Sequence, residues 1–267
     1  MSDQDWKYLS VERAGRTAVV RFDSGSRVNS LSNALMRELT DFALSIQDDS
    51  ELSCVVLTGK ENTFCAGMDL RDPELQGLAQ MTVAEKRTLL KLGPRMCAAW
   101  EAVEAVTVAA IEGHCIGGGM ALVAACDWRV AARDASLYVP ELRLGMNMSW
   151  QSVPRFVNLI GPSKTKQLLL LAEPLDAVAA ESWGLVDYLV DTGGAAEKAR
   201  ALAAQLAAMP PVPLRMAKRA INASANALND ATSYMDADQF LLTHGMADAT
   251  EGAMAFFEQR KPEFKGD

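Results

Sequence analysis

Residues 107–127 read TVAAIEGHCIGGGMALVAACD, and this stretch decides the fold of the chain around it. The run Thr107 to Ile111 predicts a buried strand, Gly113 a tight connection, and Gly117 to Gly119 the opening of a helix. Glycines let a backbone approach a ligand closely, and the first turn of a helix leaves N–H groups unpaired at the positive end of its dipole. The stretch therefore predicts a site for a phosphate or for a negative oxygen that forms during a reaction.

The residues that follow the glycines argue against a phosphate site. Met120 and Ala121 stand where a phosphate-binding loop has Lys and then Ser or Thr, and no Gly-x-Gly-x-x-Gly pattern is present. A structural interpretation stays open, in which the glycines only allow the helix to pack closely.

Composition and charge exclude several classes of partner. The 267 residues include 49% hydrophobic and 22% charged residues, which is typical of a globular protein with one large domain or a domain with an appendage. The net charge of −8 and the lack of a Lys/Arg cluster predict no nucleic-acid partner and no binding to anionic membranes. With no apolar run long enough to span a bilayer and no basic region followed by an apolar segment near residue 1, we expect a cytoplasmic protein.

The cysteines and histidines predict neither disulfides nor a metal site. The five cysteines are odd in number, lie in apolar contexts and form no Cys-x-x-Cys pair, and there are only two histidines. We therefore expect a reducing compartment, no bound metal and no structural zinc.

Strand and helix signals alternate over about the first 190 residues, and the remainder is wholly helical, as the change in hydrophobic period indicates. The predicted strands are 7–12, 17–22, 54–59, 107–111, 128–132, 136–139 and 186–190. The predicted helices are 34–46, 81–105, 154–159, 164–171, 176–183, 197–208, 214–228, 231–246 and 250–260. Residues 71–80 read as a mobile polar segment, Gly93-Pro94 as a break in a long helix, and 210–213 as a hard break.

Several motifs, in order and over nearly the whole chain, resemble the crotonase superfamily of enoyl-CoA hydratases and isomerases. They are Asn29-Ser30-Leu31, Phe64 to Leu70, Gly117 to Gly119, Cys126-Asp127, Val139-Pro140-Glu141, Trp183 to Val186 and Phe256 to Lys261. The resemblance implies an α/β fold, with a spiral of ββα repeats in residues 1–194 that carries the acyl-CoA site. It also implies a helical oligomerisation region in residues 195–267 and a homotrimer or a dimer of trimers, that is, a hexamer.

The resemblance further implies an acyl-CoA substrate, with CoA as part of the substrate and no separate cofactor. The thioester oxygen would lie between the backbone amides of Met68 and Gly118, which would stabilise an enolate. Met68 as an ordinary core methionine is the alternative.

Residues for CoA and the acyl group are also assigned by position. They are Arg27, Ala66, Gly67, Asp69, Leu70, Trp150, and Phe256 from a neighbouring subunit. Arg27 read as a solvated loop residue and Trp150 read as a packing residue are equally open. Gln259 stands where relatives often carry a lysine, so Arg260 or Lys261 would have to supply that basic contact.

Hydratases of this superfamily use two glutamates, a base for water and an acid for carbon. Glu141 occupies one position, and Ala121 occupies the other. Three explanations stay open: a Δ3,Δ2-enoyl-CoA isomerase that uses Glu141 alone, a natural protein inactive as a hydratase, or a Glu→Ala variant at position 121. We favour the last.

Residues 141–151 and the chain as a whole are most similar to the methylthioacryloyl-CoA hydratase branch, which acts in dimethylsulfoniopropionate breakdown. That similarity implies addition of water at the carbon that bears the methylthio group, loss of methanethiol, and then thioester hydrolysis. Thioester hydrolysis needs a carboxylate as nucleophile or base, so a glutamate at position 121 would have a second role and Ala121 would abolish it. Two non-enzymatic interpretations remain, an RNA-binding crotonase-like protein, which the acidic composition disfavours, and a purely structural oligomer.

Overall fold

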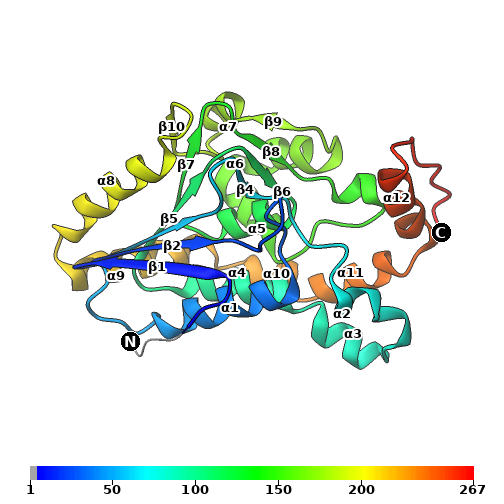
Figure 1. Cartoon of the computed structure of the whole chain (residues 1–267), viewed down its shortest axis with the longest axis horizontal. Helices are drawn as coiled ribbons and strands as arrows, with labels where there is room; N and C mark the ends of the chain where they lie inside the picture. Colours follow the sequence, from blue (N-terminus) through cyan, green and yellow to red (C-terminus); the bar gives the residue numbers. More distant parts are fainter. Residues whose placement is uncertain (1–4) are drawn as a thin grey trace.

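A computed structural model describes residues 5–267, and the polar segment 1–4 lies outside the described residues. Within the described part, the strands form two sheets (Figure 1). The larger sheet has the order β1-β2-β3-β5-β7-β10, and the smaller has the order β4-β6-β8-β9. The larger sheet consists of β1 Leu9–Ala14, β2 Thr17–Phe22, β3 Cys54–Thr58, β5 Val106–Ile111, β7 Trp128–Ala132 and β10 Tyr188–Val190. The smaller consists of β4 Thr63–Cys65, β6 His114–Ile116, β8 Ser136–Tyr138 and β9 Leu175–Asp176.

The strand order confirms the predicted spiral of ββα repeats. Strands β3, β5 and β7 of the larger sheet are parallel neighbours, and each is followed along the chain by β4, β6 or β8 of the smaller sheet. The predicted hairpin is β1 paired antiparallel with β2, with Gly15 in the turn at a φ of +56°. Strands β3 and β5 are almost wholly apolar because both of their faces are covered.

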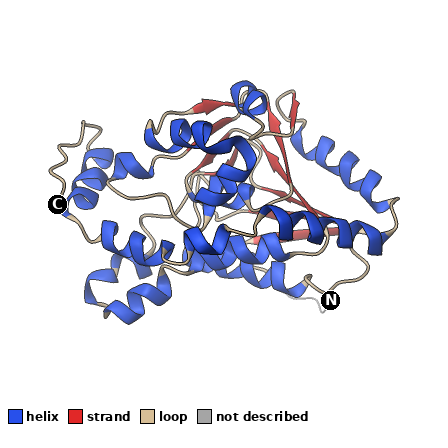
Figure 2. Ribbon diagram, turned by 180° about the vertical axis from the view of Figure 1, so that it is seen from behind, coloured by secondary structure: helices blue, strands red, loops and turns tan. Residues whose placement is uncertain are grey.

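Helices cover both faces of the larger sheet (Figure 2). Helix α8 (Ala195–Ala207) packs its buried alanines and leucines on one face, against Val56, Val108 and Val130. The other face carries the main core, to which α1 (Asn33–Ser45), α4 (Leu92–Ala102) and α5 (Gly118–Ala124) contribute. Helix α8 begins the region predicted for oligomerisation, yet it packs on the sheet of the body.

The remaining helices lie around this body and toward the C-terminus. They are α2 Pro73–Gln76, α3 Val83–Leu89, α6 Ser152–Leu170, α7 Ala177–Trp183, α9 Pro211–Ala225, α10 Asn229–Ser233, α11 Asp236–His244 and α12 Ala247–Phe257, with 3₁₀ turns at Leu78–Gln80 and Glu141–Leu144. No helix in residues 5–267 is long and apolar enough to cross a membrane.

Four predictions about helix boundaries are wrong, and proline or local capping explains most of them. Residues 71–80 form α2 and a 3₁₀ turn, with Asp72 capping α2 through Glu74 N. The long helix predicted for 81–105 breaks before Gly93-Pro94, which sits in the first turn of α4, where a missing N–H leaves no acceptor unpaired. Residues 211–213, which were predicted as part of a break between helices, likewise form the first turn of α9.

The two helices predicted between 154 and 171 are confirmed: α6 consists of two helical segments that meet at a kink at Gly161, whose φ of 71° and ψ of 166° are not helical. The fourth difference concerns continuity. The helix predicted for 231–246 is split into α10 and α11 at Tyr234-Met235.

Candidate active site

A buried asparagine shapes the loop that leads into the first small-residue corner. Asn29 has a φ of +53°, a conformation that asparagine tolerates better than most residues. Its Nδ2 donates to the carbonyls of Phe22 at 3.2 Å and Phe64 at 2.8 Å, and its Oδ1 accepts from Ser24 N at 2.9 Å. The loop after β2 is therefore tied to the end of β4.

The first corner, at Gly67 and Met68, leaves one amide free. Leu31 N donates to Gly67 O at 2.7 Å, and Asp69 N donates to Leu31 O at 2.9 Å, so these bonds bracket Met68. The amide of Met68 has no hydrogen-bond partner within residues 5–267. Gly67 has a φ of +85°, and a Cβ there would lie 3.1 Å from Ile116 O and 3.5 Å from Gly118 N. The two glycine corners are therefore in direct contact.

The second corner opens helix α5. Gly117 is the N-cap with a φ of +51°, and its N–H donates to Tyr138 O at 2.8 Å. Gly118 is the first helical residue, so its N–H has no intrahelical acceptor. A Cβ on Gly119 would lie 2.7 Å from Cβ of Cys65. Gly119 thus serves close packing, while Gly118 leaves a free amide beside the corner that holds Met68.

Glu141 faces this corner. It begins the 3₁₀ turn after Pro140, and its Oε1 lies 2.8 Å from where a Cβ on Gly117 would be. The residue is partly exposed, yet its Oε2 is buried and has no hydrogen-bond partner among the described residues. Burial raises the pKa of the carboxyl from its ordinary 4.5 to about 7. A carboxyl that titrates near neutral pH suits proton transfer.

The raised pKa also predicts how stability depends on pH. Between pH 4.5 and about 7, the folded chain holds the Glu141 proton more tightly than the unfolded chain, so the stability that this group contributes is lost as pH rises through that range. The free energy of unfolding should fall by up to about 3 kcal/mol over this window through Glu141. Glu141→Gln should remove that part of the fall, as urea unfolding at pH 5 and pH 8 would measure. An equal pH dependence in both proteins would contradict the burial of a titrating carboxyl.

Ala121 lies on the same side of α5 as the corner. It follows Gly117 by four residues and Gly118 by three, and residues at these spacings share one helix face. Its side chain is fully buried. The structure therefore places Ala121 on the helix face of Gly117 and Gly118, with Glu141 beside Gly117, and presents a methyl group where the resemblance implies a second carboxylate.

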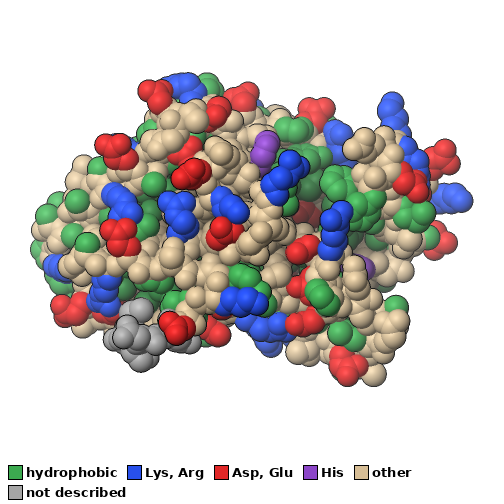
Figure 3. Space-filling model, viewed as in Figure 1, with side chains coloured by type: hydrophobic (Ala, Val, Ile, Leu, Met, Phe, Trp, Pro, Cys, Tyr) green, Lys and Arg blue, Asp and Glu red, His purple; other side chains and the backbone are tan. Residues whose placement is uncertain are grey.

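The residues predicted for CoA differ in their exposure. Arg27, Leu70 and Phe256 are exposed, whereas Ala66 and Asp69 are partly buried. Phe256 lies on α12, which packs on the turn Glu141–Leu144 of its own chain. Figure 3 shows acidic and basic side chains mixed over this face, with hydrophobic side chains gathered next to the C-terminal helices. The CoA contacts, and the covering of CoA by a neighbouring subunit, stay predictions.

Trp150 packs against the second corner. The indole atoms Cη2 and Cζ3 would lie 2.5 Å from a Cβ on Gly118. Sequence reasoning missed the three residues that fix this tryptophan, namely Gly93, Arg155 and Asp236. A glycine inside a helical pattern can indicate close packing, but the sequence analysis interprets Gly93 as part of a helix break. The other two had none, because their partners are distant in sequence.

No group of three or more His, Cys, Asp or Glu that could hold a metal ion occurs within residues 5–267. The groups that this site presents are two free amides and one carboxyl. Such a set can hold a negative oxygen and move a proton next to it.

Comparison with known proteins agrees with this arrangement. Residues 12–267 match the family described as enoyl-CoA hydratase/isomerase. The 2,3-dehydroadipyl-CoA hydratase of Escherichia coli is 30% identical over 258 residues, covering 97% of this chain and 98% of that protein. The crotonyl-CoA hydratase of Syntrophomonas wolfei is 29% identical over 260 residues, with 97% and 98% covered. An enoyl-CoA hydratase structure from Bacillus anthracis aligns with a TM-score of 0.75 at 29% identity, covering 98% of this chain and 100% of that one. The chain therefore belongs to the enoyl-CoA hydratase/isomerase family.

Proposed function

We propose that this protein binds an enoyl-CoA thioester and stabilises negative charge on its thioester oxygen with the amides of Met68 and Gly118. The observation that carries the proposal is the buried, unpartnered Oε2 of Glu141 beside a glycine corner with a free amide. Fixed donors aimed at a developing oxyanion contribute a few kcal/mol each, because they need no reorganisation during the reaction. Glu141 is the group that exchanges a proton with water or with carbon.

The reaction we propose for this scaffold is hydration, with methylthioacryloyl-CoA as the substrate. Glu141 takes a proton from water, the oxygen adds to the carbon that bears the methylthio group, and the α-carbon is protonated. The resulting hemithioacetal expels methanethiol and leaves an aldehyde acyl-CoA, whose thioester is then open to hydrolysis. The similarity of residues 141–151 to that branch supports the substrate. With alanine at position 121, we expect the chain to be impaired in these steps.

A second candidate is a Δ3,Δ2-enoyl-CoA isomerase, and one observation favours it. The helix face that lines the corner offers a methyl group at Ala121, so Glu141 is the carboxyl that faces the glycines. A double-bond shift needs one group that removes a proton and returns it, whereas hydration divides these tasks between two.

Substrate profiling separates the two reactions. The chain would be incubated with crotonyl-CoA, methylthioacryloyl-CoA and a 3-enoyl-CoA, while enoyl absorbance and free thiol are followed. We expect slow loss of enoyl absorbance from both conjugated substrates, and thiol release only from the methylthio compound. Rapid conversion of the 3-enoyl-CoA with no hydration would instead establish the isomerase. No turnover and no acyl-CoA binding would contradict the proposal and favour a structural or RNA-binding role.

We further propose that the C-terminal helices assemble several copies of the chain. Met216, Ile221 and Leu242 expose about two thirds of their surface or more, at 66%, 66% and 71%. Large apolar side chains are typical of protein–protein contacts where they form an exposed patch. Sedimentation of the chain would distinguish a trimer from a hexamer.

A further inference from the structure

The indole of Trp150 is wedged between two helices at positions where each has a glycine. A Cβ on Gly93 of α4 would overlap Cε2 and Cδ2 of the ring, and a Cβ on Gly118 of α5 would meet Cη2 and Cζ3 at 2.5 Å. Only 7% of the residue is exposed. The ring therefore fills the space between α4 and α5, and its edge touches the residue whose amide faces the thioester oxygen.

The backbone that carries Trp150 is strained. Trp150 and Gln151 have φ values of +64° and +55°, which residues other than glycine seldom adopt, least of all two in succession. Such strain persists only where the surroundings over-determine the conformation, and it is concentrated at functional sites.

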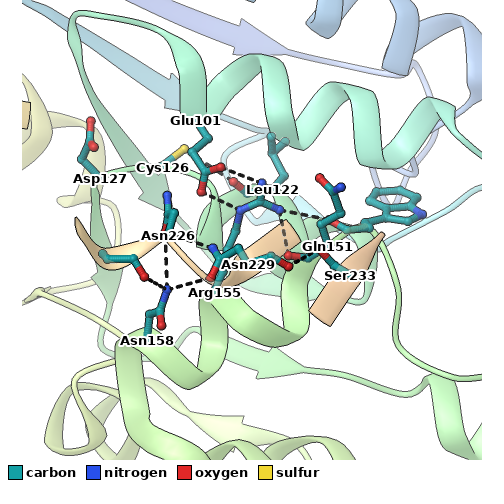
Figure 4. A network of polar contacts seen from close by, with 12 residues as sticks. Glu101, Leu122, Cys126, Asp127, Gln151, Arg155, Asn158, Asn226, Asn229 and Ser233 are labelled. Atoms are coloured by element: carbon teal, nitrogen blue, oxygen red, sulfur yellow. Dashed lines mark hydrogen bonds and ion pairs between the residues drawn. The ribbon is translucent and has the colours of Figure 1, made fainter. Parts of the chain in front are cut away.

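Two charged side chains hydrogen-bond to this turn. Arg155 Nη1 donates to the carbonyls of Trp150 at 3.1 Å and Gln151 at 3.0 Å, while Gln151 N donates to Asp236 Oδ2 at 3.0 Å. Arg155 is itself paired with both oxygens of Glu101, at 2.8 and 2.9 Å (Figure 4). Ser149 Oγ accepts from Trp150 N at 2.6 Å. Helices α4, α6 and α11 thus fix the position of one indole.

We infer that Trp150 sets the length of the acyl group, closing the pocket beside Gly118 so that only short acyl chains fit. This inference rests on the proposed function, because the thioester must lie at the Gly118 amide for its first carbons to reach the ring. The indole presents an apolar surface that suits a short alkyl or methylthio group, and sulfur packs well against aromatic edges. Asp236 is a positioning residue, since it acts on the acyl group only through the strained turn.

The test measures binding, so it does not depend on turnover. Dissociation constants for CoA, butyryl-CoA, hexanoyl-CoA and octanoyl-CoA would be determined by calorimetry for the parent chain and for Trp150→Leu. We expect the parent to bind butyryl-CoA better than octanoyl-CoA by about tenfold or more, and Trp150→Leu to reverse or abolish that preference. Trp183→Leu is the matched control, because that indole lies on α7 over Lys164, and its loss should leave the profile unchanged.

A second pair of variants tests the wedge itself. Gly93→Ala adds a methyl group that overlaps the indole, so it should weaken butyryl-CoA binding and lower the thermal midpoint. In the Trp150→Leu background, the same change should be tolerated or stabilising, since alanine is the better helix residue. Asp236→Ala should broaden the chain-length profile, and Asp236→Asn, which keeps an acceptor for Gln151 N, should largely restore it.

The possible outcomes distinguish failure of the inference about Trp150 from failure of the proposed function. If the parent binds butyryl-CoA no better than CoA, the proposed function fails and the inference falls with it. If the parent prefers butyryl-CoA and folded Trp150→Leu keeps the same profile, the function stands and the inference alone is overturned. Trp150→Phe, a smaller change, serves the same comparison should the leucine variant not fold.

Discussion

Ala121→Glu is expected to raise the rate of enoyl-CoA hydration by about 10²- to 10⁴-fold, the usual contribution of one general acid or base. The new carboxyl would extend from a position on the face of α5 that carries Gly117 and Gly118, toward Glu141. Two carboxyls there would divide the tasks of activating water and protonating carbon. Loss of enoyl absorbance from crotonyl-CoA, and methanethiol release from methylthioacryloyl-CoA, would measure the gain.

Ala121→Gln is the matched control for this gain. It adds nearly the same volume at a fully buried position but cannot exchange a proton at neutral pH. We expect it to share any loss of stability with Ala121→Glu and none of the increase in rate. A glutamate variant that folds, binds acyl-CoA and hydrates no faster than the parent would rule out the two-carboxylate hydratase.

Glu141→Gln is expected to lower the rate by about 10²- to 10⁴-fold, which is the usual contribution of one general base. The affected rate is hydration when the substitution is made in the Ala121→Glu protein, and isomerisation when it is made in the parent chain. Glutamine keeps the shape and contacts of the side chain near Gly117, so the loss belongs to proton transfer. Rates with saturating substrate, together with the affinity for butyryl-CoA, would show a fall in kcat with little change in binding.

The dependence of the rate on pH gives a second test of Glu141 as the base. Because the base acts when ionised and its pKa is raised to about 7, the rate should fall about tenfold for each pH unit below that value. Glu181→Gln, which removes an exposed carboxyl on α7, should leave both the rate and the profile unchanged. A profile that stays flat down to pH 5 would show that Glu141 is not the base.

Much of the fold followed from local pattern. The hairpin around Gly15, the apolar strands β3 and β5, and helix α7 with its Asp176 cap and Gly184 end were predicted nearly to their boundaries. Strands buried on both faces, caps and glycine ends each leave a signal within a few residues. The prolines of α4 and α9 misled the prediction, because a proline in a first turn and a proline that breaks a helix look alike in sequence.

The candidate site divides in the same way. The glycines, the carboxyl of Glu141 and the alanine at 121 were identified from residue types and motif order. The raised pKa of Glu141 was not, since it comes from burial against Gly117, a neighbour through folding alone. The packing of Trp150 was not predicted either, because its contacts come from α4, α5, α6 and α11.

The sequence by itself determined the strands of the larger sheet, the family and the chemical groups available, because these depend on residue type and short-range spacing, whereas the short strands β4, β6 and β9 of the smaller sheet were not predicted. Only the tertiary structure decided which groups meet. It set the corner at Gly67 against Gly118, left one oxygen of Glu141 buried without a partner, and seated Trp150 between Gly93 and Gly118. Each of these depends on close packing between segments far apart in the chain, and packing fixes distances that no local pattern encodes.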